Sequence, residues 1–190
     1  MSPPRLFVAV LPPAHALDEL RRAVAPLRAL PGGDALRWTD APGWHFTLAF
    51  LGGVDEELMT ELYERLARAA HRTEPFPLRI GGSGRFDGRV LWAGAEGGLD
   101  TLGLLAARVD AAARRTGLPV EPGRSHTPHL TLARGRAPTD LRPYVTALGA
   151  FRGTPWQVTG ISLVRSHPPV GGVPGARPAY EVVAGWPLGR

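Results

Sequence analysis

The sequence contains no cysteine and no lysine, and each absence excludes a class of chemistry. Without cysteine the chain forms no disulfide, carries no thiolate nucleophile and offers no sulfur ligand to a metal. Without lysine it forms neither a lysyl-nucleotide intermediate nor a Schiff base.

The sequence also lacks a long hydrophobic run. No apolar stretch approaches the roughly 18 residues that a membrane-spanning helix needs. The short apolar run at residues 6–11 ends at Pro12 and Pro13, and no small-residue cleavage site follows it. This pattern argues against a secretory signal. We therefore expect a cytoplasmic protein that does not bind a membrane.

Positive charge is present in excess, and arginine supplies all of it. The 22 basic residues give a net charge of +5, and the isoelectric point is near 10.8. Because the planar guanidinium group matches phosphate well, a polyanionic partner is favoured. Charge alone does not identify that partner as nucleic acid.

One short pattern occurs twice, as HFTLA at residues 45–49 and as HLTLA at residues 129–133. In a β-strand, residues two apart lie on the same face. Each copy therefore predicts a strand that points its histidine and threonine to one side and buries its apolar residues on the other. Core strands with only local hydrogen bonds are the alternative, but a matched repeat makes chance less probable than a single copy would.

The rest of the chain alternates predicted strands with amphipathic helices. Long helices, many short strands and hairpin-like links favour an α+β fold over a doubly wound parallel sheet. Because the two motif copies lie close to half a chain length apart, we expect two similar lobes that face each other across a cleft. Residues 1–190 are expected to form one bilobal domain, with residues 81–88 as a hairpin loop. Helices are predicted at residues 14–27, 55–70, 99–116 and 140–148, and strands at residues 6–11, 45–51, 77–80, 90–93, 127–133, 156–158, 161–165 and 180–183.

Two imidazoles and two hydroxyls at one site suit the hydrolysis of a phosphodiester. The attacking water must lose a proton, and the leaving oxygen on the opposite side of phosphorus must gain one. Because imidazole titrates near neutral pH, a neutral histidine can act as base while a protonated one acts as acid. Threonine hydroxyls can donate hydrogen bonds to the non-bridging oxygens without a metal. The sequence therefore predicts a catalytic site at His45, Thr47, His129 and Thr131.

With these residues the chain resembles the two-histidine phosphoesterases, and within them the bacterial and archaeal RNA 2',3'-cyclic phosphodiesterases formerly named 2'-5' RNA ligases. The resemblance covers nearly the whole chain and rests on residues 5–10, 44–52 and 128–134. It implies a bilobal fold in which antiparallel sheets line a central groove, with helices outside. It also implies metal-independent opening of a terminal 2',3'-cyclic phosphate on RNA, usually leaving a 2'-phosphate, without a cofactor.

The resemblance also guides the roles of individual residues. We assign His45 as the proton donor to O3' and His129 as the proton acceptor, although a pseudo-symmetric site permits the reverse. The resemblance adds Arg134 as a phosphate contact. Strict strand alternation would turn Arg134 away from His129, so it reaches the site only if the strand ends or bulges before residues 135–136. A solvated surface arginine is the alternative.

Other functions stay open at this point. The same residues would serve ATP-independent joining of RNA halves through a 2'-5' bond, with a ribose hydroxyl in place of water. The substrate could instead be a small cyclic nucleotide or a 2'-5' oligoadenylate. A module that only binds RNA phosphates would show salt-sensitive binding without turnover.

The remaining candidate residues carry weaker signals. His126 and His129 have a zinc-like spacing, but the proline between them argues against the helix that would bring them together. Three aromatic residues could stack on a nucleobase, although aromatic residues in apolar runs usually lie in the core. We assign no role to these three, which are Trp44, Phe50 and Trp92. We expect a monomer that holds no metal.

Overall fold

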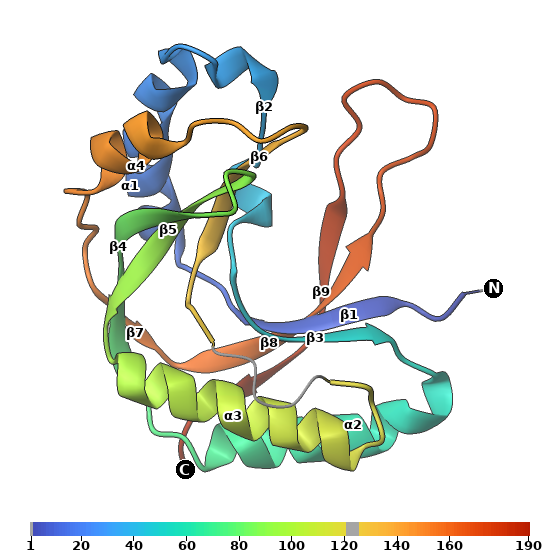
Figure 1. Ribbon diagram of the computed structural model, residues 1–190. Coiled ribbons are helices and arrows are strands. Elements are labelled where there is room, and N and C mark those ends of the chain that lie inside the picture. Colours follow the sequence, from blue (N-terminus) through green and yellow to red (C-terminus); the bar gives the residue numbers. More distant parts are fainter. Residues whose placement is uncertain (1, 121–125) are drawn as a thin grey trace.

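Two antiparallel β-sheets form the centre of the molecule (Figure 1). The computed structural model describes residues 2–120 and 126–190. The first sheet has the strand order β3-β1-β8-β9, and the second has the order β2-β6-β5-β4-β7. The strands of the first sheet are β3 (Phe46–Gly53), β1 (Arg5–Val10), β8 (Gly160–His167) and β9 (Ala179–Pro187). Those of the second are β2 (Leu36–Trp38), β6 (Leu130–Gly135), β5 (Val90–Gly97), β4 (Phe76–Phe86) and β7 (Trp156–Val158).

The helices lie on the outer faces of the two sheets (Figure 1). Two of them, α2 (Glu56–His71) and α3 (Leu99–Arg115), pack against each other and against strands of the first sheet. The other two, α1 (Ala14–Val24) and α4 (Arg142–Leu148), contact β4 of the second sheet. Short 3-10 helices span Ala25–Ala29, Gly33–Ala35 and Ala41–Gly43. In the described part of the chain, no helix is both long and apolar enough to cross a bilayer.

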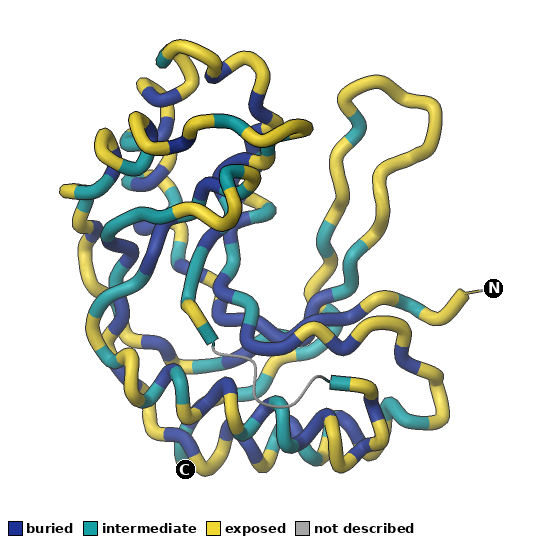
Figure 2. Tube along the Cα trace, in the orientation of Figure 1, coloured by how far each residue is buried: buried dark blue, intermediate teal, exposed yellow. Residues whose placement is uncertain are grey.

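Helix α2 shows why the sequence folds this way locally. Its first turn carries Glu56 and Glu57, and its last turn carries basic residues, so charges of both signs complement the helix dipole. Leu62 and Leu66 are four residues apart and fall on one face, where both are buried. The helix therefore has one apolar stripe to cover a sheet, and Figure 2 shows the buried positions gathered where helices meet sheets.

The first sheet is apolar on both faces. Along β1, alternate residues belong to the main core shared with the helices; these are Leu6, Val8 and Val10. The residues between them point the other way, and Phe7 and Ala9 form a second, smaller cluster with Val164 and the partly buried Tyr180. This second cluster lies on the face of the sheet away from the helices. It provides the apolar surroundings of the site described below.

The predicted α+β class is confirmed, and most of the predicted elements are present. The predicted hairpin between these strands is present, since β4 and β5 pair antiparallel. The interpretation of residues 81–88 as its loop is wrong, because β4 continues to Phe86 and only a tight turn at residues 87–89 joins it to β5. The glycine-rich sequence hides this strand, since it lacks apolar alternation and carries an irregularity between Ile80 and Ser83. The helix predicted at residues 14–27 is α1 followed directly by the 3-10 helix Ala25–Ala29. Strand β2 and the other two 3-10 helices have no counterpart among the predicted elements. Each motif strand begins one residue after its histidine.

Gly84 is required by a close contact within the second sheet. Gly84 pairs in register with Trp92, and the indole ring lies directly over it. A Cβ atom at this position would come 2.1 Å from Cζ2 of Trp92. Because Trp92 in turn borders His129, with ring centroids 6.2 Å apart, this glycine helps to set the position of a motif histidine.

We predict that Gly84→Ala destabilises the protein by about 1–3 kcal/mol, because the added methyl group collides with the indole. The matched control is Gly103→Ala in α3, where a Cβ atom would meet nothing within 4 Å. That change should stabilise the protein by about 0.5–1 kcal/mol, since alanine favours the helix. Urea unfolding of both variants measures the difference. If Gly84→Ala and Gly103→Ala change the free energy of unfolding equally, the indole of Trp92 does not lie against Gly84.

Candidate functional site

The two motif histidines come from different sheets and lie near each other. His45 immediately precedes β3 of the first sheet, and His129 immediately precedes β6 of the second. Both strands run through the middle of the molecule (Figure 1). The positive charge of His129 is close enough to lower the pKa of His45. The structure thus brings together two residues that are far apart in the sequence.

Each motif strand contains a β-bulge, and the two bulges fall at matching positions. In the pairing of β3 with β1, Thr47 is opposite Ala9 but Ala49 is opposite Val8, so Leu48 is an extra residue. In the pairing of β6 with β5, Thr131 is opposite Trp92 and Ala133 is opposite Leu91. Leu132 is therefore the extra residue of β6. The repeat in the sequence corresponds to a repeat in backbone geometry.

The bulges reset which side chains face the site. In β6, two consecutive residues after Thr131 are buried, Leu132 and Ala133, and Arg134 is then exposed. A bulge restores Arg134 to the same face as Thr131, which strict alternation would have prevented. The positive charge of Arg134 reaches Tyr180 of the other sheet, where it acts on the pKa of the phenol. The strand therefore bulges before residues 135–136, as the sequence required for Arg134 to face the same side as Thr131.

Phe50 occupies the equivalent position in the other motif strand. It follows Leu48 and Ala49, which are both buried, and its side chain is 68% exposed. Its ring centroid lies 6.1 Å from that of Phe7, on the face of the sheet away from the helices. The two halves of the site therefore differ at this position: one offers an apolar ring and the other a guanidinium group.

His45 lies in an apolar environment. Its ring stacks on Phe7 at a centroid distance of 4.5 Å and meets the edge of Tyr180 at 5.2 Å. Burial is the main cause that lowers the pKa of His45 to about 4, and the charge of His129 lowers it further. Burial also raises the pKa of Tyr180, an effect that the charge of Arg134 opposes. At neutral pH both rings are therefore uncharged.

His129 is held by its backbone and by two aromatic rings. Its Nδ1 lies 2.7 Å from the carbonyl oxygen of Thr127. Because a carbonyl only accepts hydrogen bonds, Nδ1 carries the proton, and Nε2 is the nitrogen that gains or loses one. The edge-on ring of Phe86 lies 5.0 Å from the imidazole, and Trp92 lies on the same side. These contacts fix the tautomer and limit rotation of the ring.

His126 makes a contact that sequence reasoning missed. Its Nε2 donates to the carbonyl oxygen of Thr47 at 2.9 Å, which joins the segment before one motif strand to the other motif strand. His126 also lies near Asp110 of α3, where its charge opposes the rise in the pKa of Asp110 that burial causes. The sequence suggests a role for His126 and His129 together only as zinc ligands. In the structure His126 instead links its segment to β3 through a hydrogen bond, and His129 lies at the site.

The three aromatic candidates differ in how deeply they are buried. Trp44 is 3% exposed and belongs to the main core, so it cannot stack on a ligand. Trp92, in contrast, lies beside His129. Phe50 lies near Phe7, on the face of the first sheet away from the helices. Among residues 2–120 and 126–190, no three His, Asp or Glu side chains come together in a way that could hold a metal ion.

Comparisons with known proteins agree with this geometry. A family model described as the 2'-5' RNA ligase superfamily matches residues 6–168. A Thermus thermophilus protein named RNA 2',3'-cyclic phosphodiesterase is 33% identical over 173 residues, which cover 86% of this chain and 82% of that protein. A Geobacillus stearothermophilus protein with the same name is 31% identical over 158 residues, 80% of this chain but only 47% of its own length. The crystal structure of Escherichia coli LigT complexed with 3'-AMP aligns over all of both chains, with a TM-score of 0.71 and 28% identity.

The pKa of His45 yields a direct test of its surroundings. In the free protein, NMR titration of the His45 imidazole should give a midpoint of about 4. Inorganic phosphate should raise this midpoint, because a neighbouring anion favours the imidazolium form. His129→Gln should also raise it, but only in part, since burial is the larger cause. A midpoint near 6.5 in the free protein, unmoved by phosphate, would rule out this environment.

Proposed function

The chain belongs to the 2'-5' RNA ligase superfamily, and we propose that it hydrolyses the terminal 2',3'-cyclic phosphate of RNA to a 2'-phosphate. The observation that carries this proposal is the approach of His45 and His129 from two different sheets, each followed two residues later by a half-buried threonine. The names of the relatives from Thermus and Geobacillus support the substrate class. The chemistry needs no group beyond these side chains and water.

In the proposed reaction His129 is the base and His45 is the acid. Water attacks phosphorus while its proton passes to Nε2 of His129, whose Nδ1 stays bonded to the Thr127 carbonyl. The bond from phosphorus to O3' breaks on the opposite side, and His45 gives its proton to O3'. The phosphoryl group stays on O2', so the product is a 2'-phosphate. The proton gained by His129 then returns through solvent to His45.

The low pKa of His45 has a consequence for substrate binding. A proton donor must be protonated, and in the free protein burial is the main cause that keeps His45 neutral. A bound phosphodiester carries a negative charge that favours the imidazolium form. We therefore propose that substrate binding itself loads the acid, so that His45 takes up a proton only when a phosphate is present. Because burial disfavours the charged form of His45, the imidazolium readily gives this proton to the leaving oxygen.

Three side chains would stabilise the charge on the non-bridging oxygens. Thr47 and Thr131 lie two residues from their histidines and can donate from their hydroxyls. Arg134 adds a full positive charge, placed on their face by the bulge in β6. The exposed rings of Phe50 and Phe86, on opposite sides of the histidine pair, provide surfaces on which the terminal nucleoside can stack.

The family description favours one second candidate, the joining of RNA ends through a 2'-5' bond. The same two histidines would serve it, with a ribose hydroxyl replacing water, and the reaction would be reversible. We further propose that residues 1–190 act as one bilobal domain and as a monomer in the cytoplasm. The family match extends across both sheets, which supports the single domain.

We expect His45→Ala and His129→Ala each to lower kcat by about 10²–10⁴ on an RNA that ends in a 2',3'-cyclic phosphate. The matched control is His15→Ala. His15 is exposed on α1, which covers the outside of the second sheet, so this variant should keep full activity. EDTA should not reduce the wild-type rate. Mass and NMR analysis of the product should find the phosphate on O2'. The rates of hydrolysis and of joining to a 5'-hydroxyl RNA, measured on the same samples, show which reaction is faster. Near wild-type turnover in either alanine variant refutes the two-histidine mechanism.

Arg134→Ala should lower kcat/KM by about ten- to a hundredfold, because a charge-assisted hydrogen bond to phosphate is worth about 1.5–3 kcal/mol. Arg134→Lys should recover part of this activity, since it keeps the charge but not the planar fork. The control is Arg21→Ala on α1, whose side chain pairs with Asp18 at 2.6 Å. If KM and kcat of Arg134→Ala both equal those of the control, Arg134 makes no phosphate contact.

A further inference from the structure

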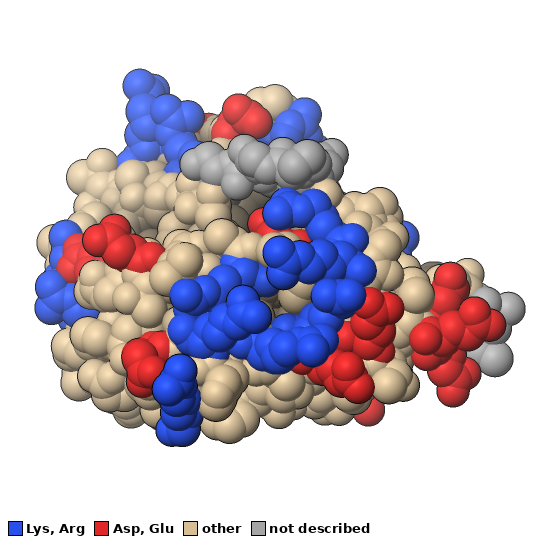
Figure 3. Space-filling view, turned by 90° about the horizontal axis from the view of Figure 1, so that it is seen from below, with Lys and Arg blue, Asp and Glu red and all other residues tan. Residues whose placement is uncertain are grey.

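A cluster of arginines lies on the outer surface of α2 and α3, on different elements from the motif histidines. Five arginines from the two helices surround one hollow, and Figure 3 shows their side chains as a continuous basic area on that face. We name this hollow the α2–α3 arginine pocket. Its arginines are Arg65, Arg68, Arg72, Arg108 and Arg115.

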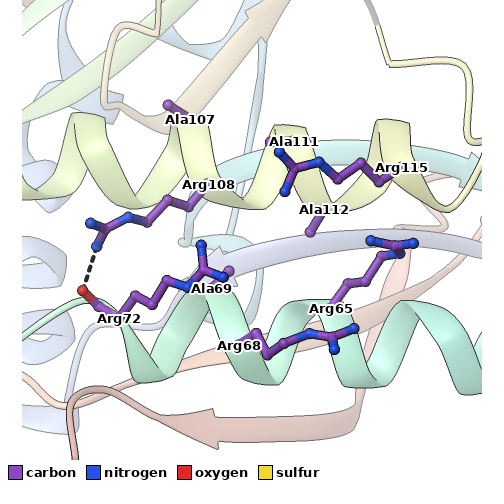
Figure 4. A pocket seen from close by; sticks show the side chains of 9 residues that line it. All are labelled: Arg65, Arg68, Ala69, Arg72, Ala107, Arg108, Ala111, Ala112 and Arg115. Carbon is purple, nitrogen blue, oxygen red and sulfur yellow. Dashed lines mark hydrogen bonds between the residues drawn. The ribbon is translucent and has the colours of Figure 1, made fainter.

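The hollow exists because its floor is made of small side chains. Four alanines line it, so the two helices leave a cavity of about 250 Å³ between their arginines; these are Ala69, Ala107, Ala111 and Ala112. Figure 4 shows Arg108 beside Arg72 at one end and Arg115 beside Arg65 at the other. The guanidinium groups therefore project around a concave surface and not from a flat one.

Most of the positive charge in the pocket is not neutralised. Arg65 pairs with Glu61 at 2.5 Å, and Arg68 is 4.0 Å from Glu64. Within the described ranges, Arg72, Arg108 and Arg115 have no carboxylate within ion-pair distance.

Two hydrogen bonds fix Arg108 without neutralising its charge. It donates to the carbonyl oxygen of Arg72 at 2.5 Å and to Oγ1 of Thr73 at 2.8 Å, which holds it between the two helices. A cluster of like charges is repulsive, and an anion that binds among them relieves this repulsion.

The spacing of the arginines fits a chain of phosphates better than a single one. Arg65 of α2 and Arg72, the residue that caps its C-terminus in helical conformation, are seven residues apart, as are Arg108 and Arg115 of α3. Seven residues correspond to about 10 Å along a helix. At a rise of roughly 3.4 Å per nucleotide in a stacked strand, this length spans about three phosphates. Guanidinium groups bind phosphate oxygens in pairs, which adds geometric selectivity.

We propose that the α2–α3 arginine pocket binds the phosphate backbone of RNA at a distance from the end that reacts. The choice of RNA rests on the proposed function, since a substrate with a terminal cyclic phosphate has a polyanionic body that must lie somewhere on the protein. The helices separate this pocket from the face of the first sheet that carries Phe7 and His45. The pocket is thus a second binding surface for the same polymer.

An anionic membrane is a weaker match for this surface. Membrane-binding helices combine basic residues with large apolar side chains that insert among the lipids. The pocket is lined only by arginine and alanine, and its floor is recessed. Its chemistry suits a strand that enters the hollow and meets charge from both sides.

The test measures binding of a fluorescently labelled single-stranded RNA with a 3'-hydroxyl end, which cannot be hydrolysed. Arg72→Gln combined with Arg115→Gln should weaken binding about tenfold, and should lower the slope of log K against log salt by about 0.7 for each phosphate that the variant no longer neutralises. The control removes the same charge from α1, as Arg21→Gln combined with Arg22→Gln, and should keep the slope. Arg68→Gln combined with Arg115→Gln is a second pocket variant and should behave like the first.

Turnover separates this proposal from the catalytic one. On a 2',3'-cyclic mononucleotide, which has no polymer body, the pocket variants should match the control, whereas on a long RNA their KM should rise. Equal RNA affinity and equal salt slope in pocket and control variants would overturn the pocket proposal, as would wild-type binding to phosphatidylserine vesicles without binding to RNA. If the wild type binds RNA through the pocket but opens no cyclic phosphate, only the catalytic proposal fails.

Discussion

Two extra residues, Leu48 and Leu132, determine which side chain joins the histidine and threonine of each motif on the face of the site. Each leucine breaks the alternation of a motif strand, is buried together with the alanine that follows it, and so returns the next side chain to the inner face. Without them the threonines would still face inward, but Phe50 and Arg134 would point toward the core. The bulges therefore extend each motif from a histidine and a threonine to three residues on one face.

The two halves of the site share this backbone but differ in their electrostatics. His45 lies among Phe7 and Tyr180, where the charged form of an imidazole is disfavoured, while His129 is held through Nδ1 by a carbonyl oxygen. A duplicated motif thus carries two different environments, which is what a pair of acid and base requires. In the proposed mechanism a bound anion offsets the cost of charging the desolvated His45, so ligand binding and proton uptake by His45 are linked.

Much of the architecture could be predicted from periodicity and from the repeated motif. Helices α2 and α3 have long apolar stripes and charged ends, and their predicted limits agree with the structure to within a residue or two. The extension of β4 could not be predicted, because glycine and serine leave no pattern when a strand is held by its backbone pairing. The brace from His126 to Thr47 and the approach of Arg134 to Tyr180 depend on the packing of two sheets. Such interactions between distant segments leave no local signal in a single sequence.

The strand order of the first sheet ties the N-terminus to the C-terminus. Strand β1 is the neighbour of β8, and β9 supplies Tyr180 beside His45, so nearly the whole chain must be synthesised before this sheet is complete. A nascent chain that has left the ribosome only as far as β6 already contains both motifs and can pair β1 with β3, but the side of β1 that pairs with β8 is then an open edge. A chain that ended between β8 and Tyr180 would therefore retain every motif residue and the Phe7 ring that stacks on His45, but it would lack Tyr180. Such a chain would also leave the β9 side of β8 as an open edge, which favours aggregation.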